Sequence, residues 1–249
     1  MKTTTSLLVA GALGALAIAA PAAAQSRDGQ FAVTTRGGYI DWGRATSLQG
    51  APFIGLDADY ALHRFVSLGT SLLVARPNTR GEDFLTTQTY GLNTSGDTTF
   101  VYGASQAVSI VNGELLATLR YPVNRFTPFL AGGVGMYGMF MDPQVSGSAR
   151  RANGMSGTLG GGVAVRLSER AGLQFDVRNL TFFDYDRLKL DPTNGRNSYA
   201  ALFGEDFAAP PSRSSRVNSL VFTLGFRYIP GGGVDDGPRD PNLPREDQR

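Results

Sequence analysis

Most of the chain alternates, residue by residue, between apolar side chains and small or polar ones. The clearest segment places three apolar residues on one face of an extended strand and three polar residues on the other, and it reads Leu173-Gln174-Phe175-Asp176-Val177-Arg178. Successive side chains of a strand point to opposite faces, whereas a helix repeats its apolar residues every three or four positions. Because the period of two dominates, the sequence predicts an all-β protein.

Eight segments carry this alternation, each bounded by turn-forming residues. They lie near residues 31–41, 54–60, 66–72, 111–121, 129–137, 159–167, 173–178 and 220–228. In the first segment Arg36, Gly37 and Gly38 interrupt the pattern, so the sequence leaves open which of its side chains share a face.

The connections between these segments alternate in length. Short polar turns lie at residues 62–65, 122–127 and 168–171, and long polar links lie at residues 42–51, 76–99, 141–156 and 184–216. An even number of strands with short turns at one end and long loops at the other is typical of bacterial outer-membrane barrels. The sequence therefore predicts an eight-stranded antiparallel up-and-down transmembrane β-barrel, with both termini at the short-turn, periplasmic end.

The two ends of the chain differ from the barrel in composition. Residues 1–24 contain a positive start at Lys2, an apolar run and the sequence Ala22-Ala23-Ala24, which together predict a secretory signal peptide. Residues 25–228 are expected to form the barrel. Residues 229–249 are rich in proline, glycine and acids, and they are expected to form a disordered periplasmic tail.

Composition excludes several classes of site. The chain has no cysteine and a single histidine, His63, which excludes disulfide scaffolds, thiolate metal sites and multi-histidine sites. Removing Lys2 with the signal peptide leaves 22 Lys and Arg against 21 Asp and Glu. Such a balance gives no broad attraction to nucleic acid. We expect no metal, no cofactor and no nucleic-acid partner.

A membrane barrel presents its apolar face to lipid, whereas a soluble lipocalin-like binder turns that face inward. The polar face here is rich in Gly and Ala, which suits a narrow, filled lumen. Aromatic residues also gather near both strand ends, as in the two girdles of a membrane barrel. By the short turns these are Tyr60, Phe65, Tyr121, Phe126, Phe129 and Tyr228; by the long loops they are Tyr39, Trp42, Phe100, Tyr102, Tyr137, Phe140, Phe182, Phe183 and Tyr185. Lipid contact is favoured, and the lipocalin-like binder is kept as an alternative.

Three stretches also resemble a known family. Residues 115–122 followed by 126–135, residues 160–170 and residues 223–228 are similar to strands of the OmpA-like transmembrane domain and its porin-family relatives, which are small outer-membrane β-barrels. The chain departs from that family by continuing for 21 residues after the aromatic Tyr228. It also shows no peptidoglycan-binding domain after the barrel, so a tether to the cell wall is not carried over.

The resemblance implies a non-enzymatic, monomeric protein of the Gram-negative outer membrane. Its role would be in envelope integrity or in surface interaction through the extracellular loops. The implied partners are outer-membrane lipids and lipopolysaccharide, with the barrel-assembly machinery and periplasmic chaperones during biogenesis. The pair Arg150-Arg151 is a candidate contact for lipopolysaccharide phosphates.

Eight ionisable residues fall on the inward, polar face. An unpaired ion is costly in a narrow lumen, so these residues are expected to pair and to close the lumen as a carboxylate–arginine plug, with Arg166 and Asp176 as one cross-strand pair. In the alternative, the same residues line a narrow porin-like channel. They are Asp57, Asp59, Glu114, Arg120, Arg166, Asp176, Arg178 and Arg227.

His63 and the serines of residues 212–215 raise a further alternative, a lipid-A-modifying outer-membrane enzyme. Catalysis would need the histidine beside a hydroxyl nucleophile. The predicted topology places His63 in a short turn and these serines in a long loop, at opposite ends of the barrel. The sequence therefore predicts that the protein is not an enzyme.

Overall fold

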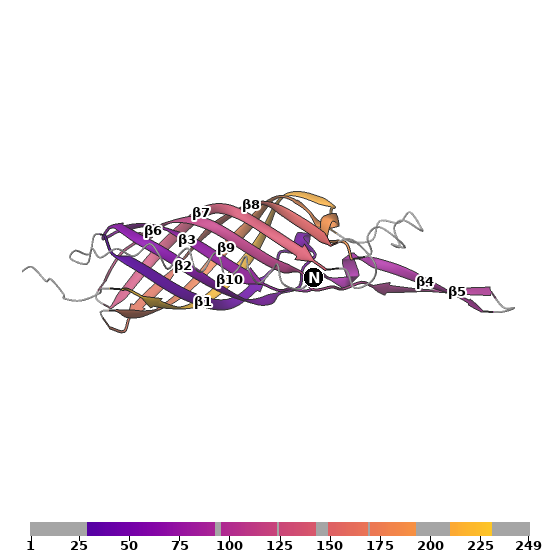
Figure 1. Ribbon diagram of the computed structural model, residues 1–249, viewed down its shortest axis with the longest axis horizontal. Coiled ribbons are helices and arrows are strands. Elements are labelled where there is room, and N and C mark those ends of the chain that lie inside the picture. Colours follow the sequence, from indigo (N-terminus) through magenta and orange to yellow (C-terminus); the bar gives the residue numbers. More distant parts are fainter. Residues whose placement is uncertain are drawn as a thin grey trace, which may run out of the picture.

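In the part of the chain that the structure describes, eight antiparallel strands close into a barrel in the order β1-β10-β9-β8-β7-β6-β3-β2 (Figure 1). This computed structural model describes residues 29–92, 96–123, 125–142, 149–168, 170–192 and 210–230. The barrel strands are β1 (Phe31–Asp41), β2 (Ala51–His63), β3 (Val66–Ala75), β6 (Ser109–Arg120), β7 (Phe126–Met141), β8 (Arg150–Arg166), β9 (Ala171–Asp186) and β10 (Arg213–Tyr228). The predicted fold class is confirmed. The expected signal peptide and residues 231–249 of the expected tail lie outside the described residues.

Strand β1 completes the ring because it pairs with β2 on one side and with β10 on the other. Thr34, for example, faces Asp57 of β2 and Arg227 of β10. Both registers run through Gly37 without a shift, so the side chains alternate regularly along the strand. Arg36 is therefore buried inside the barrel. The structure thus fixes the orientation that the sequence left open.

Several strands are longer than the sequence pattern indicates. Strands β7 to β10 have 16 or 17 residues each, and most of the extra residues lie toward the long loops. A strand needs only about 9–11 residues to cross a bilayer. The outward residues of β10 change from apolar at Leu220 to polar at Asn218 and Arg216, all exposed. The strand ends near the long loops lack the apolar alternation because they extend beyond the apolar belt.

The second long link, predicted as a polar connection over residues 76–99, extends to residue 108 and contains regular secondary structure. It contains the hairpin of β4 (Leu85–Leu92) and β5 (Gly96–Gly103), which forms a separate two-stranded sheet. The hairpin projects beyond the end of the barrel at the right of Figure 1. Short 3-10 helices η1 (Arg44–Thr46), η2 (Gly81–Asp83) and η3 (Arg187–Leu190) occupy parts of the long links. None of the helices in the described residues is long and apolar enough to span a membrane.

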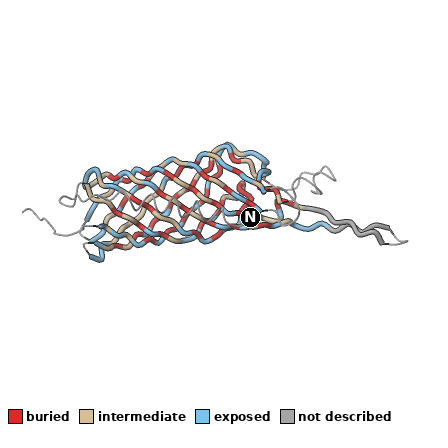
Figure 2. The backbone as a smooth tube through the Cα atoms, viewed as in Figure 1, coloured by how far each residue is buried: buried red, intermediate tan, exposed pale blue. Residues whose placement is uncertain are grey.

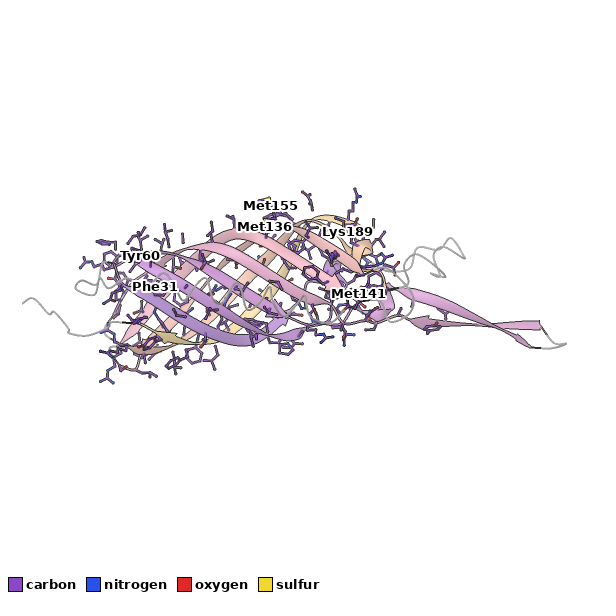
Figure 3. The ribbon with its side chains drawn as sticks, in the orientation of Figure 1. Phe31, Tyr60, Met136, Met141, Met155 and Lys189 are labelled. Atoms are coloured by element: carbon purple, nitrogen blue, oxygen red, sulfur yellow. The ribbon has the colours of Figure 1, made fainter. Side chains whose placement is uncertain are left out.

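The outside of the barrel is apolar. Buried and exposed residues alternate along the strands in Figure 2, and Met136 and Met155 project outward in Figure 3. Leu159 keeps 70% of its surface exposed. The exposed belt also contains Ile54, Leu68, Leu115, Leu119, Leu130, Val134, Phe175, Val177, Leu220, Phe222, Leu224 and Phe226. A soluble protein rarely exposes so large a continuous apolar surface, and a lipocalin-like barrel would turn this face inward. The orientation of the faces excludes the lipocalin alternative.

Candidate functional site

Four charged residues meet in the middle of the lumen, and we call them the inner tetrad: Arg36, Asp57, Asp176 and Arg178. Asp57 forms ion pairs with Arg36 Nε at 3.0 Å and with Arg178 Nη2 at 3.1 Å, and Arg178 Nε lies 2.8 Å from Asp176 Oδ1. These side chains are at most 8% exposed. Two arginines and two carboxylates neutralise one another, which offsets the cost of burying each charge.

Two neutral side chains complete the contacts of the inner tetrad. Gln174 Nε2 donates to Asp176 Oδ2 at 3.0 Å, and Arg36 Nη2 donates to Ser71 Oγ. Sequence reasoning placed Asp57, Asp176 and Arg178 on the inward face but missed Arg36. Arg36 was missed because Gly37 and Gly38 hid the phase of β1, and the eight expected residues, four acids and four arginines, gave no charge imbalance that would have pointed to it.

A second group of charges lies nearer the short turns, and we call it the mouth triad: Asp59, Arg120 and Arg227. Arg227 binds the Asp59 carboxylate with two nitrogens, at 3.0 and 2.8 Å, and Arg120 Nη2 binds it at 2.9 Å. The three side chains come from β2, β6 and β10, so they join strands that are not neighbours. Two guanidiniums share one carboxylate, which leaves one positive charge in excess.

Glu114 lies beside the inner tetrad but is not part of it. In the register it faces Ser71 of β3, which in turn faces Asp57 of β2. Its Oε1 is buried and has no hydrogen-bond partner among the described residues. Nearby on the same strand, Asn112 Oδ1 accepts a hydrogen bond from Ser156 Oγ of β8 at 2.7 Å. This corner of the lumen is therefore polar without being ion-paired.

The expected ion pair between Arg166 and Asp176 is wrong. Arg166 faces Gly172 in the register, whereas Asp176 faces Gly162, four residues farther into the barrel. Asp176 pairs with Arg178 instead. Arg166 is exposed at the short-turn end and is the one member of the eight expected plug residues that lies outside the buried interior. The two residues lie at different distances from the turn, since Arg166 is two residues before Ser168 whereas Asp176 is five residues after Ala171, so the regular register keeps them apart.

The long-loop end of the lumen is filled by apolar and aromatic side chains, which we call the loop-end core. Phe182 lies at its centre, with ring centroids 4.3 Å from Tyr137 and 5.8 Å from Trp42. All three are at most 4% exposed. The core also contains Ile40, Leu48, Phe53, Leu73, Val108, Ile110, Met139, Met141, Leu180, Tyr185, Leu190, Val217 and Val221. The lumen is thus closed at this end by packing rather than by charge.

The loop-end core corrects the expected outer girdle of aromatics. Trp42, Tyr137, Phe182 and Tyr185 were expected near the membrane interface but are buried inside. Phe182 continues the inward phase of Asp176 and Arg178, so the alternation already indicated its direction. Tyr185 turns inward because the preceding Asp184 has a positive φ of 49°, which breaks the alternation and was not visible in the sequence. Phe129, expected in the short-turn girdle, also points inward.

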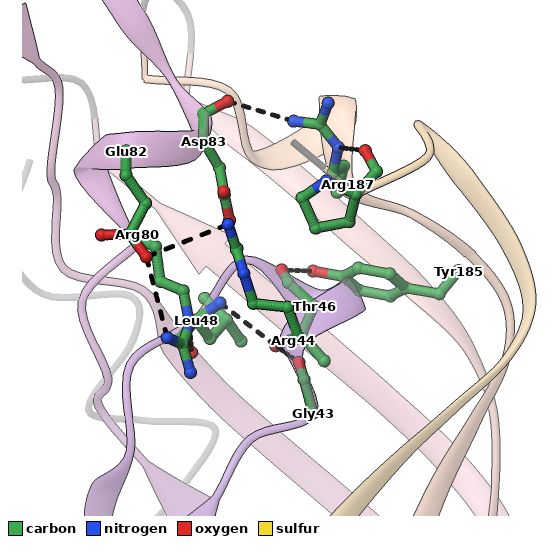
Figure 4. Close-up of polar contacts among 10 residues, drawn as sticks. Gly43, Arg44, Thr46, Leu48, Arg80, Glu82, Asp83, Tyr185 and Arg187 are labelled. Carbon is green, nitrogen blue, oxygen red and sulfur yellow. Dashed lines mark hydrogen bonds and ion pairs between the residues drawn. The ribbon is translucent and has the colours of Figure 1, made fainter. Parts of the chain in front are cut away.

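Polar contacts tie the long links together above the loop-end core and form what we call the cap (Figure 4). Tyr185 donates its hydroxyl to the Thr46 carbonyl at 2.9 Å, and Arg44 pairs with Asp83. Arg187 donates to the carbonyls of Pro210 at 2.7 Å and Asp83 at 3.2 Å. The hydrogen bond from Arg44 to the Asp83 carboxylate raises the pKa of the Arg44 guanidinium. The cap joins links that are far apart in sequence.

The short-turn end of the lumen is hollow. A cavity of about 480 Å³, which we call the vestibule, opens among the short turns and reaches inward to Asp57, Gln174 and Arg178. His63 lines its mouth, whereas Ser214 and Ser215 lie at the opposite end, beside Asp184 and Asp186. The separation of His63 from these serines is as the sequence predicts. No group of three or more metal-ligating side chains occurs within the described residues.

The comparisons with known proteins identify the fold alone. No protein-family model matches the chain, and no curated protein matches its sequence. Neisserial surface protein A is similar in structure, with a TM-score of 0.51 and 10% identity over 80% of this chain and 96% of that chain. The N-terminal β-barrel domain of Pseudomonas aeruginosa OprF gives a TM-score of 0.39, with 11% identity over 81% of this chain and 99% of that one. The chain therefore has the fold of the small eight-stranded outer-membrane β-barrel proteins.

Proposed function

We propose that this protein is a non-enzymatic outer-membrane protein that acts at the cell surface through its long-loop end, in envelope integrity or in surface interaction. The observation that supports this proposal is the closed lumen. The loop-end core and the cap fill the long-loop end of the barrel, and the inner tetrad crosses its middle. A barrel that is closed at this end offers no path through its lumen, so at the long-loop end its outer surfaces are what other molecules can reach.

The proposed orientation places the long-loop end outside the cell and the short turns in the periplasm. It follows from the general pattern of outer-membrane barrels, in which the periplasmic turns are short. The export signal expected in residues 1–24 would deliver the chain to the periplasm of a Gram-negative cell, where chaperones and the assembly machinery would insert it as a monomer.

Lipopolysaccharide is the partner that the chemistry of the long-loop end favours. Exposed Arg151 and Arg216 lie on the outer faces of β8 and β10, above the apolar belt that Met155 and Leu220 represent. Arginines at that height would meet the phosphates of the outer leaflet, to which guanidinium groups bind well. We therefore propose lipopolysaccharide and outer-membrane lipids as its permanent surroundings.

A narrow channel and a lipid-A-modifying enzyme are less well supported. A channel needs a continuous wet path, but Trp42 and Tyr137 both pack against Phe182 in the loop end of the lumen. A triad of the esterase type needs its histidine and hydroxyl within hydrogen-bond reach. His63 and the serines near residue 214 lie at opposite ends of the barrel.

Two measurements on the full chain test the proposal. Heat-modifiable gel mobility in outer-membrane fractions tests the membrane barrel, because a folded barrel resists detergent until it is heated. Planar-bilayer recording then tests the closed lumen, and we expect no discrete conductance steps. Steps that changed after Glu114→Gln would instead establish the channel, and a changed mass of lipid A on expression would establish the enzyme.

A further inference from the structure

The vestibule carries more arginine than carboxylate. Among the described residues that line it, the charged side chains are Arg64, Arg120, Arg166, Arg178, Arg227, Asp57 and Asp59. Each of the two carboxylates is already paired with two guanidiniums. Asp57 binds Arg36 and Arg178, and Asp59 binds Arg120 and Arg227. The described wall of the vestibule therefore has positive charge that its own acids do not neutralise.

Two of these arginines flank a residue that has no side chain. Gly172 of β9 faces Arg166 of β8 on one side and Arg227 of β10 on the other. Neighbouring strands lie about 4.8 Å apart, so the two arginine backbones are separated by about 10 Å. All three residues line the vestibule. The two arginines thus flank a part of the vestibule that Gly172 lines without a side chain.

The donors around this space are incompletely paired. The Arg166 side chain makes no hydrogen bond or ion pair with any described residue, and Arg227 shares its carboxylate with Arg120. Deeper in the vestibule, Arg178 Nη1 is buried without a partner in the described part of the chain. Donors of this kind are stabilised by an oxyanion, because guanidinium groups bind carboxylate and phosphate oxygens by charge-assisted hydrogen bonds.

We propose that the vestibule is an anion-binding site in which one carboxylate or phosphate group sits over Gly172 between Arg166 and Arg227, with Arg120 on the opposite wall. A volume of about 480 Å³ holds such a group together with water. The proposal of this site depends on the geometry of the short-turn end alone. The proposed orientation of the barrel is needed only to place the site in the periplasm.

The anionic group has two possible sources. One is a free anion that enters the vestibule from solution. The other is the chain itself, because Ile229 lines the vestibule and the acids Asp235 and Asp236 follow six and seven residues later. An extended chain of that length spans about 20 Å, and a tethered group acts at a high effective concentration.

Arginine side-chain NMR of the full chain in zwitterionic phosphatidylcholine nanodiscs tests the proposal. Inorganic phosphate is the probe, added at constant ionic strength with chloride as the balancing anion. We expect saturable shifts of the Nε–Hε signals of Arg166 and Arg227. Arg166→Gln should weaken the apparent phosphate affinity about tenfold, which corresponds to the loss of one charge-assisted hydrogen bond. The matched control is Arg151→Gln, which removes an exposed arginine from the other end of β8 and should leave the affinity unchanged.

A second arm distinguishes the two sources. In the full chain, Asp235→Asn together with Asp236→Asn should tighten phosphate binding if these carboxylates occupy the site, and should leave it unchanged if the natural anion is free. Heat-modifiable mobility verifies that each variant is folded. The proposal is overturned if phosphate gives no saturable shift in either the natural chain or this double variant. It is also overturned if Arg166→Gln and Arg151→Gln bind phosphate equally well.

Discussion

Individual arginines of the lumen differ in how completely they are removed from water. Arg178 is 4% exposed and holds two carboxylates, whereas Arg166 lies at the open end of the vestibule. Removal of a charge costs most where the charges left behind have no access to water. The same substitution at the two positions therefore compares the loss of a buried, ion-paired arginine with the loss of an exposed one.

Arg178→Met should lower the free energy of unfolding by about 3–5 kcal/mol, because it leaves Asp57 and Asp176 with one guanidinium between them. Arg166→Met is the control and should change that free energy by less than about 0.5 kcal/mol. Urea unfolding in lipid vesicles measures both variants. Equal costs at the two positions would show that the interior is wetter than the inner tetrad implies.

On the lipid-facing side of a strand, apolar side chains are favoured and charged ones are not. Phe175 lies on the outer face of β9, between Leu173 and Val177, and is exposed. Phe175→Arg should cost about 2–4 kcal/mol of unfolding free energy, because a charge near the bilayer midplane is poorly solvated. Phe175→Leu keeps an apolar contact with lipid and is the control. If vesicle unfolding found the two variants equally stable, β9 would face the membrane with its other side.

At the scale of elements, the cap depends on a few contacts between long links. Asp83→Asn should weaken the contact with Arg44 and destabilise the cap by about 1–3 kcal/mol, since the Asp83 side chain is fully buried. Glu82→Gln is the matched control, because Glu82 approaches the same arginine at 3.9 Å but is 64% exposed. It should cost less than about 1 kcal/mol. Hydrogen exchange at the amides of Thr46 and Phe84 measures the difference, and equal exchange in both variants would contradict the role of Asp83.

The barrel strands were predictable from sequence to the extent that their two faces meet different surroundings. Strand β10 could be predicted from Leu220 to Tyr228, because the side chains there alternate between lipid and lumen. The upper parts of β7 to β9 could not, because above the apolar belt an outward residue such as Asn153 is as polar as a loop residue. Period alone also cannot anticipate the positive φ of Asp184, which turns Tyr185 inward. The cap was missed for a different reason, since its contacts join residues from separate links.

For the whole molecule, the orientation in the membrane can be tested directly because the chain has no cysteine. Lys189→Cys places a thiol at the exposed long-loop end, and Arg64→Cys places one in an exposed short turn. An impermeant maleimide should label Lys189→Cys in intact cells and Arg64→Cys only after the outer membrane is permeabilised. Labelling of Arg64→Cys in intact cells would invert the proposed orientation.

The contacts that close the molecule also determine when it can become stable during folding. The hydrogen bond between Tyr185 and Thr46 spans 139 residues of sequence, and the pairing of Arg227 with Asp59 spans 168. Contacts of such long range form only after the entropic cost of closing a long loop is met, and proteins dominated by them fold slowly. Since β1 pairs with β10, the first strand must wait for the last one to be synthesised. Until then its backbone edge is unpaired and able to join another chain, so a chaperone that covers this edge would be needed for the whole interval before ring closure.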